Sequence, residues 1–198
     1  MSVQRADRAG AGVGPDDLRR LFRRHAAAVA VITTSHRDAP VGLLVTSLAS
    51  VSATPALISF NVSLTSSSWP ALRTCEHIGV HVLAHDQEDL AGRFARKGAD
   101  RFTAATGWQL GPFRVPLIDD VAARSIAVVE QRVPAGDHVI VVARLLDVST
   151  RDELAPLLHH DGGYHRAVPT APSTADDQTG DGPGAARLSV VRSDPAHP

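Results

Sequence analysis

The sequence has very few of the residues that build disulfide frameworks, metal–thiolate clusters or base-stacking surfaces. Cys75 is the only cysteine among 198 residues, which excludes an internal disulfide and a thiolate cluster and suits a reducing compartment. Aromatic residues make up 4% of the chain, too few for a surface that stacks the bases of a single nucleic-acid strand. The core must therefore be built from aliphatic side chains.

The chain also lacks an excess of charge and a long apolar run. Its 20 basic and 21 acidic residues give a formal net charge of -1, so no overall field attracts nucleic acid or an anionic membrane. The longest apolar stretch, Ala26 to Ile32, is far shorter than the ~20 residues of a membrane-spanning helix. The polar start, Met1 to Pro15, has no apolar segment typical of a signal peptide. We therefore expect a cytoplasmic protein that binds neither nucleic acid nor membrane.

What the chain does contain is enough apolar material, 43% of its residues, for the core of one domain. We place this domain at residues 15–168, after a flexible N-terminus at 1–14. Beyond Val168 the composition shifts to Pro, Thr, Ser, Asp and Gly, which predicts a disordered C-terminal tail at 169–198. Leu188, Val190 and Val191 could dock onto the domain, but a loose end is the favoured interpretation.

Apolar and alternating runs predict a series of strands separated by turns. These runs lie at Ala28 to Thr34, Val41 to Val51, Ala56 to Val62, Ile78 to Leu83, Ser125 to Val133 and His138 to Val148. A turn at His36 to Pro40 joins the first two into a hairpin. Several strands at short spacing predict a mainly β domain, an antiparallel barrel or sandwich.

Three short helices are expected beside these strands. The first starts at Asp16 and buries a stripe of Leu18, Leu21 and Phe22. The other two cover Ser67 to Cys75 and Asp86 to Ala95.

Hydroxyl groups lie inside the apolar segment at 42–52. Thr46, Ser47, Ser50 and Ser52 would need hydrogen-bonding partners if they are buried, and the amide-like edges of a heteroaromatic ring would supply them. The alternative is that they occupy edge-strand positions and bond to water or to the backbone. This segment alone favours that alternative.

Two further segments suit an anion. The run from Ser63 to Trp69 places hydroxyls, including Ser66, Ser67 and Ser68, at a helix N-terminus, where a phosphate can bind. A plain helix cap explains Ser67 or Ser68 equally well.

In the basic loop at 94–102, Lys97 and Arg101 could hold a phosphate, and Phe94 or Phe102 could cover a ring. A solvated helix end explains this loop equally well.

Histidines are the remaining candidates. His138, in a turn that leads into a strand, could donate to a bound cofactor or to a developing anion, with Tyr164 later in the chain. A lone histidine is more often an ordinary surface residue. The 10 histidines lack metal-ligand spacing apart from His81 and His85, which we interpret as strand and turn residues, so no metal site is expected.

Taken in order, these segments resemble the flavin reductase family, the FMN-binding split-barrel proteins that are reductase components of two-component flavin monooxygenases. The similarity runs from about Leu18 to Val168. The matching stretches are Phe22-Arg-Arg, Val29-Ala-Val-Ile-Thr-Thr, Pro40-Val-Gly-Leu-Leu-Val-Thr-Ser, Ser50-Val-Ser, Ser66-Ser-Ser-Trp-Pro-Ala-Leu, Arg93-Phe-Ala, Asp100-Arg-Phe and Gly136-Asp-His.

The resemblance implies a six-stranded antiparallel split β-barrel that pairs into a homodimer, with the flavin in a groove near the interface. It implies an NAD(P)H:flavin oxidoreductase that uses NADH or NADPH to reduce FMN or FAD and passes the reduced flavin to a monooxygenase. The isoalloxazine contacts map onto Val45, Thr46, Ser47 and Ser52, with Ser50 in the same matching stretch. The phosphate loop maps onto Ser66, Ser67 and Ser68, the Asp-Arg-Phe element onto Asp100, Arg101 and Phe102, and the residue nearest hydride transfer onto His138.

The chain departs from the family pattern at four positions. Leu44 and Thr46 stand where many relatives have Thr and Asn, Leu64 stands where a basic residue is frequent, and His81 stands where Asn is frequent. A non-catalytic flavin-binding split barrel and a pyridoxamine-phosphate oxidase-like enzyme remain open as alternatives. The sequence leaves the choices of flavin and of nicotinamide open as well.

Overall fold

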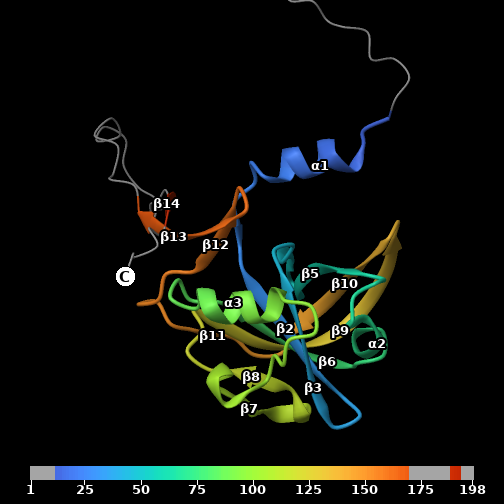
Figure 1. Ribbon diagram of the computed structural model, residues 1–198. Coiled ribbons are helices and arrows are strands. Elements are labelled where there is room, and N and C mark those ends of the chain that lie inside the picture. The colour runs from blue at the N-terminus through green and yellow to red at the C-terminus, as the bar shows by residue number, and fades with distance from the viewer. Residues whose placement is uncertain (1–11, 170–187, 193–198) are drawn as a thin grey trace, which may run out of the picture.

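One antiparallel sheet organises the molecule. The computed structural model describes residues 12–169 and 188–192. In spatial order the strands are β3 (Ala39–Val45), β2 (Ala30–His36), β6 (His77–Val82), β9 (Ala123–Ala135), β10 (His138–Leu145), β5 (Ala56–Ser63) and β4 (Ala49–Ala53), with β11 (Ser149–Thr150) paired onto β9. The mainly β, antiparallel fold of the split-barrel type is confirmed (Figure 1).

The sheet has eight strands where six were expected. The run predicted at Val41 to Val51 is divided, because β3 ends at Val45 and β4 begins at Ala49. The short strand β11 adds the eighth by pairing with the start of β9.

A second sheet corrects the expectation of a wholly disordered tail. Its strands are β1 (Ala27–Ala28), β12 (Leu157–His160), β13 (Gly163–Pro169) and β14 (Leu188–Arg192). The last strand pairs antiparallel with β13, from Pro169 opposite Leu188 to His165 opposite Arg192. The β-branched run near the C-terminus thus finds an open strand edge that the sequence could not reveal. Residues 1–11, 170–187 and 193–198 lie outside the described part, including most of the predicted flexible ends.

The hairpin between β2 and β3 sets the position of the later site. Its two loop residues, Arg37 and Asp38, both have positive φ, 52° and 64°, as in the two-residue turns that suit twisted hairpins. The turn predicted at His36 to Pro40 is confirmed, and the register places Gly42 opposite Thr33.

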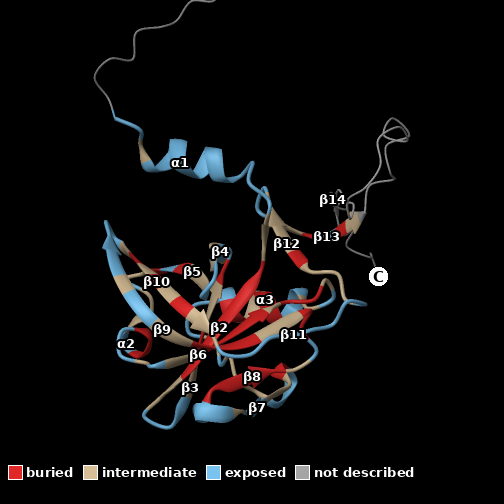
Figure 2. Cartoon of the chain, turned by 180° about the vertical axis from the view of Figure 1, so that it is seen from behind, coloured by how far each residue is buried: buried red, intermediate tan, exposed pale blue. Residues whose placement is uncertain are grey.

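The core forms on both faces of β2. Ile32 packs inside the sheet with residues such as Phe60 and Ile78, whereas its neighbour Val31 packs against Phe94. Successive side chains of a strand point to opposite faces, and both faces of β2 are covered, so β2 is buried along most of its length (Figure 2). Phe94 comes from α3 (Glu88–Ala95), the helix predicted at Asp86 to Ala95.

The first helix, α1 (Pro15–Phe22), exists as predicted, but its apolar stripe is not buried. Leu18, Leu21 and Phe22 are 52%, 67% and 59% exposed. The expectation of a buried stripe is therefore wrong for the single chain. The chain that follows α1 is held in the second sheet through β1, so the helix stands off the barrel (Figure 1).

The remaining elements are short. Helix α2 covers Trp69–Leu72 rather than the predicted Ser67 to Cys75. The others are β7 (Trp108–Leu110), which pairs with β8 (Pro116–Ile118), and the 3-10 turns η1 (Ala104–Thr106) and η2 (Pro112–Arg114). None of the helices in the described ranges is long and apolar enough to span a bilayer.

Candidate flavin site

The hydroxyl-rich loop, the Asp-Arg-Phe element and β3 meet at a cavity of about 370 Å³, here called the inner cavity. Its lining residues are Pro40, Val41, Gly42, Ser67, Ser68, Ala99, Asp100, Arg101 and Phe102. The Ser68 hydroxyl donates to the carbonyl oxygen of Gly42 at 2.8 Å. Arg101 Nη1 donates to that same oxygen at 2.9 Å and to Ser68 Oγ at 3.3 Å. Three segments far apart in the sequence are therefore tied together around one backbone carbonyl.

The inner cavity fits an anion such as a phosphate. Arg101 Nε is buried and has no hydrogen-bond partner among the residues that the structure describes. Nearby, Ser66 Oγ accepts the backbone N–H of Ser68 at 3.2 Å, while Ser67 is exposed at the mouth. A buried donor without a partner is costly, and an anionic oxygen would satisfy it.

The wall of the inner cavity depends on close aromatic packing. A Cβ atom added to Gly42 would lie 2.3 Å from Phe94 Cε1, so only glycine lets β3 approach this ring. The rings of Phe94 and Phe102 meet edge to face at 5.4 Å, and Phe102 meets Trp108 in the same way at 5.2 Å. Phe94 is 2% exposed, so Phe102 rather than Phe94 faces the cavity.

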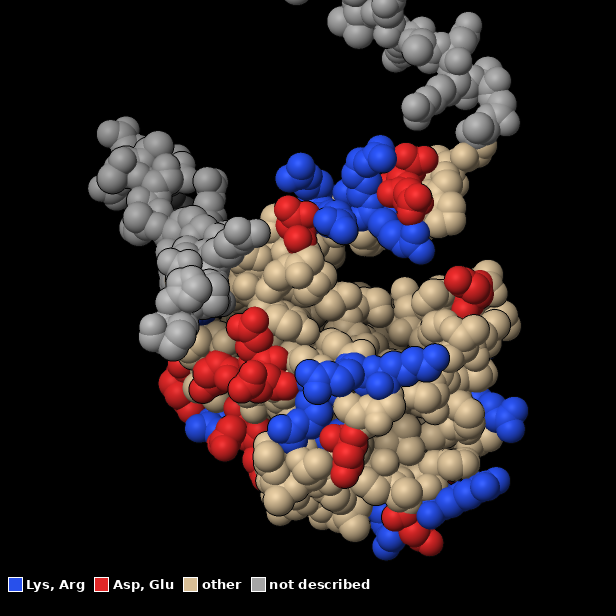
Figure 3. All heavy atoms as spheres, in the orientation of Figure 1, with Lys and Arg blue, Asp and Glu red and all other residues tan. Residues whose placement is uncertain are grey.

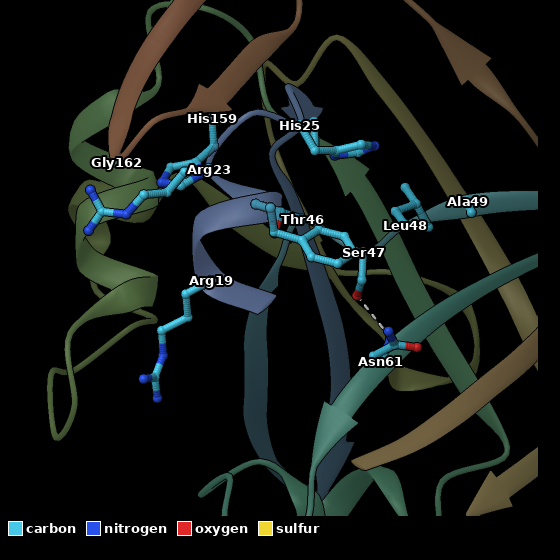
Figure 4. Close-up of a pocket in the computed structure, with 12 residues that line it drawn as sticks. Arg19, Arg23, His25, Thr46, Ser47, Leu48, Ala49, Asn61, His159 and Gly162 are labelled. Atoms are coloured by element: carbon cyan, nitrogen blue, oxygen red, sulfur yellow. Dashed lines mark hydrogen bonds between the residues drawn. The ribbon is translucent and has the colours of Figure 1, made fainter. Parts of the chain in front are cut away.

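A second, larger cavity of about 690 Å³, here called the outer cavity, lies between the barrel and α1. Its lining residues are Arg19, Phe22, Arg23, His25, Ala27, Thr46, Ser47, Leu48, Ala49, Asn61, His159 and Gly162 (Figure 4). The backbone N–H of Asn61 donates to Ser47 Oγ at 2.9 Å, which fixes the loop after β3 against β5. The side chain of Val45 is in the core, so only its backbone can face a ligand.

The two cavities lie along the same strand. Gly42 lines the inner cavity, and Thr46, four residues later, lines the outer cavity. Four residues of extended chain separate these two positions by roughly 13 Å. A ligand with a ring at one end and a phosphate at the other can therefore lie along β3.

His138 lies near the outer cavity but is not part of its lining. It opens β10 and pairs with Ser63 of β5. Because Val62 and Val139 are buried, Ser63, His138 and Asn61 point to the opposite, outer face of this strand pair. His138 Nδ1–H donates to Asp137 Oδ1 at 2.7 Å, which lowers the pKa of that carboxyl and leaves Nε2 as the nitrogen that a ligand would meet.

Seven of the candidate residues line neither cavity: Val45, Ser66 and His138, which are described above, and Ser50, Ser52, Lys97 and Tyr164. Ser50 and Ser52 lie on β4, on either side of an irregularity in its pairing with β5. Lys97 lies in the exposed turn after α3. Tyr164 packs beside α3 and lines a separate pocket with residues such as Arg93. The structure thus brings together Ser66 to Ser68 with the Asp-Arg-Phe element, and Thr46 with Ser47, but not the last four with either group.

Sequence reasoning did not nominate several residues of these cavities, among them Asn61 and Gly42. Asn61 could have been found, because it is the polar position between Phe60 and Val62 in an alternating strand. Gly42 could not, because its role depends on Phe94, which is 52 residues away.

The histidines interpreted as strand and turn residues are placed as such. His81 is fully buried in β6, and its Nδ1–H donates to the carbonyl oxygen of Val31 at 3.1 Å. Burial lowers the pKa of His81 to about 4, so it is neutral at pH 7. Within the described ranges, no group of three or more His, Cys, Asp or Glu side chains is arranged to hold a metal ion.

Comparisons with known proteins agree with this arrangement. The chain is 37% identical over 162 residues to an NADH:FMN oxidoreductase of Rhodococcus qingshengii, and the match covers 80% of this chain and 84% of the relative. It is 31% identical over 156 residues to HsaB, the reductase subunit of a flavin-dependent monooxygenase of Mycobacterium tuberculosis, covering 78% and 83% of the two chains.

A crystal structure of a flavin reductase domain protein from Arthrobacter sp. FB24 superposes with a TM-score of 0.74 at 40% identity, covering 79% of this chain and 97% of that one. The family model described as "Flavin reductase like domain" matches residues 22–167. That span includes both cavities except for Arg19. The chain therefore belongs to the flavin reductase family.

Proposed function

We propose that this protein is an NAD(P)H:flavin oxidoreductase, which reduces FMN, or FAD, with NADH or NADPH. The observation that carries the proposal is the convergence of Ser68 and Arg101 on the Gly42 carbonyl at one end of β3, with Thr46 and Ser47 at the other. When the flavin and the nicotinamide cofactor are both bound, the flavin ring accepts a hydride from the reduced nicotinamide. The relatives named NADH:FMN oxidoreductase and monooxygenase reductase subunit support the same reaction.

The residues divide into two tasks. Arg101 and the loop at Ser66 to Ser68 bind the phosphate, because they combine a partly buried guanidinium, whose Nε has no partner among the described residues, with hydroxyl groups. Asp100 and Phe102 shape this end, since Asp100 Oδ1 accepts the backbone N–H of Phe102 at 3.3 Å.

At the other end, the backbone of Val45 to Ser47 and the Asn61 side chain face the ring edge. His138, held by Asp137, orients the reacting pair through Nε2. The proposal assigns no contact to Ser50, Ser52, Lys97 or Tyr164, which lie on β4, in the exposed turn after α3 and in a separate pocket.

The reduced flavin would be passed to a monooxygenase component, as the name of the Mycobacterium relative indicates for that protein. We also propose a homodimer, because α1 exposes Leu18, Leu21 and Phe22, and a second copy would cover this apolar face. The cytoplasm remains the proposed location, since the single Cys75 cannot form an internal disulfide.

The test combines an assay with one substitution. Purified protein mixed with NADH and FMN should consume the absorbance of the reduced nicotinamide, and repeating the assay with FAD and NADPH identifies the preferred pair. His138→Ala should lower the hydride-transfer rate roughly tenfold to a hundredfold, as expected for one positioned donor. The FMN dissociation constant, measured by flavin fluorescence, should change far less.

A matched control is His36→Ala, at the end of β2 by the hairpin, which should leave the rate unchanged. An unaltered rate in His138→Ala rejects the role of that residue. Binding of FMN without consumption of NADH or NADPH would instead indicate the non-catalytic flavin-binding protein that the sequence left open.

A further inference from the structure

The outer cavity carries a charge that the flavin site does not explain. Among its lining residues the only permanently charged side chains are Arg19 and Arg23, with His25 and His159 beside them, and none is Asp or Glu. The chain as a whole has a formal net charge of -1, so this is a local concentration of positive charge. Figure 3 shows basic side chains of α1 overhanging the hollow above the barrel. Such an environment suits an anionic ligand.

The four basic residues come from three neighbouring segments, which are α1 with its C-cap, the linker before β1, and β12. Arg19 and Arg23 are four residues apart at the end of α1, which places them on one side of the helix. His159 is opposite Ala27 in the pairing of β1 with β12, which places it next to the segment that carries His25. In Figure 4, Arg23 and His159 lie across the cavity from Ser47 and Asn61, and the guanidinium of Arg23 points away from that pair, on the side of its partner Asp161.

The two arginines are only weakly engaged within the protein. Arg19 Nη1 lies 2.6 Å from Asp16 Oδ1, and Arg23 Nη1 lies 3.9 Å from Asp161 Oδ1, with the arginine side chains 73% and 67% exposed. Exposed pairs of this kind contribute about 0–1 kcal/mol. A phosphate, which guanidinium groups bind in bidentate geometry, can therefore displace either carboxylate.

We propose that Arg19 and Arg23, with His25 and His159, bind the phosphates of the nicotinamide dinucleotide. This inference rests on the proposed function, in which the flavin phosphate occupies the inner cavity with Ser68 and Arg101. An anion at the opposite end of β3 then belongs to the second ligand, and NADH carries a pyrophosphate. Arg19 precedes residue 22, where the family match begins, so the Arg19 contact lies outside the matched domain.

The experiment uses ADP-ribose, which carries the pyrophosphate but no nicotinamide and cannot react. Titration calorimetry of FMN-loaded protein with ADP-ribose should show binding, and the Arg19→Gln/Arg23→Gln double variant should weaken it about tenfold. Glutamine has nearly the helix propensity of arginine, so α1 should persist. The FMN dissociation constant should change less than twofold, and the KM for NADH should rise while kcat changes little.

The matched control is Arg20→Gln/Arg24→Gln, which removes the same charge from residues that do not line the cavity. It should leave ADP-ribose binding and the KM for NADH unchanged. Equal losses in both double variants would overturn the proposal in favour of a general charge effect. Weaker FAD binding in Arg19→Gln/Arg23→Gln, with ADP-ribose binding intact, would overturn it by assigning the cations to the flavin adenylate. A protein that binds ADP-ribose through these arginines but does not reduce flavin would contradict only the proposed function.

Discussion

The inner and outer cavities lie at opposite ends of β3 and are built in opposite ways. At the inner cavity, buried side chains meet a backbone carbonyl, and aromatic rings pack so closely that Gly42 has no room for a side chain. At the outer cavity, the lining comes partly from an exposed helix whose charged groups are loosely paired. A preorganised site suits a group that must be held in one place, whereas an open site suits a ligand that enters and leaves.

The largest expected difference between the two cavities comes from equivalent phenylalanine substitutions. Phe94→Ala should lower the free energy of unfolding by about 3–5 kcal/mol, because it empties a buried site that packs against Gly42 and Phe102. Phe22→Ala, at the 59% exposed side chain of α1, should cost less than about 0.5 kcal/mol in the single chain. Urea denaturation at several protein concentrations measures both.

The concentration series also tests the homodimer. If a second copy covers α1, the cost of Phe22→Ala grows as protein concentration rises, because association stabilises the wild type. If Phe94→Ala lowered the free energy of unfolding by no more than Phe22→Ala does, the contrast between the cavities would be removed.

The next largest effect is a loss of stability in acid. His81 donates to Val31, a residue of the same cluster as Phe94, and has a pKa of about 4 in the folded state against 6.5 for an ordinary histidine. The unfolded chain therefore binds more protons between these values, so the His81 contribution is complete above pH 6.5 and is lost as the pH falls toward 4. The loss should reach about 3 kcal/mol.

Comparison with His81→Asn isolates this effect, because asparagine can still donate to Val31 but does not titrate. The difference in unfolding free energy between the two proteins should narrow from pH 7 to pH 4.5. Parallel pH profiles would show that His81 is not the source of the acid sensitivity.

The smallest of the three effects concerns two glycines. Gly42→Ala should cost about 1–3 kcal/mol and weaken FMN binding, because the added methyl group collides with Phe94 and shifts β3. Gly92→Ala, in α3 with no atom within 4 Å of the added Cβ, should instead stabilise the protein by about 0.5–1 kcal/mol. Thermal unfolding and FMN titration of both variants measure this contrast. Equal shifts in the two variants would mean that β3 has more room at Gly42 than its contacts indicate.

Local patterns were sufficient for the longer strands of the main sheet and for part of the site, but not for the second sheet or the β7–β8 pair. The β-rich run from Ala28 to Thr34 and the turn after it predicted β2 and the hairpin, since strand propensity and turn chemistry are local properties. The hydroxyl-rich loop was predicted to hold a phosphate, and Lys97 and Arg101 were predicted to be able to hold one; the loop and Arg101 line one cavity, whereas Lys97 does not.

The errors share one cause. Leu18, Leu21 and Phe22 have the spacing of a buried stripe, but periodicity reports which side of a helix is apolar and not what covers it. In the same way, the run at Leu188 to Arg192 was assigned to a disordered tail, because the edge of β13 that it pairs with is not visible in its own composition.

The amino-acid sequence by itself determined the longer strands of the main sheet, their order along the chain and the chemical types of the candidate site residues, because propensity, periodicity and turn preference act over a few residues. Only the tertiary structure decided that Gly42 must lack a side chain, that Ser68 and Arg101 share one carbonyl, and that Arg19 and Arg23 line the same cavity as Thr46 and Ser47. These features depend on contacts between residues that are distant in the chain, and such contacts exist only once the sheet has formed.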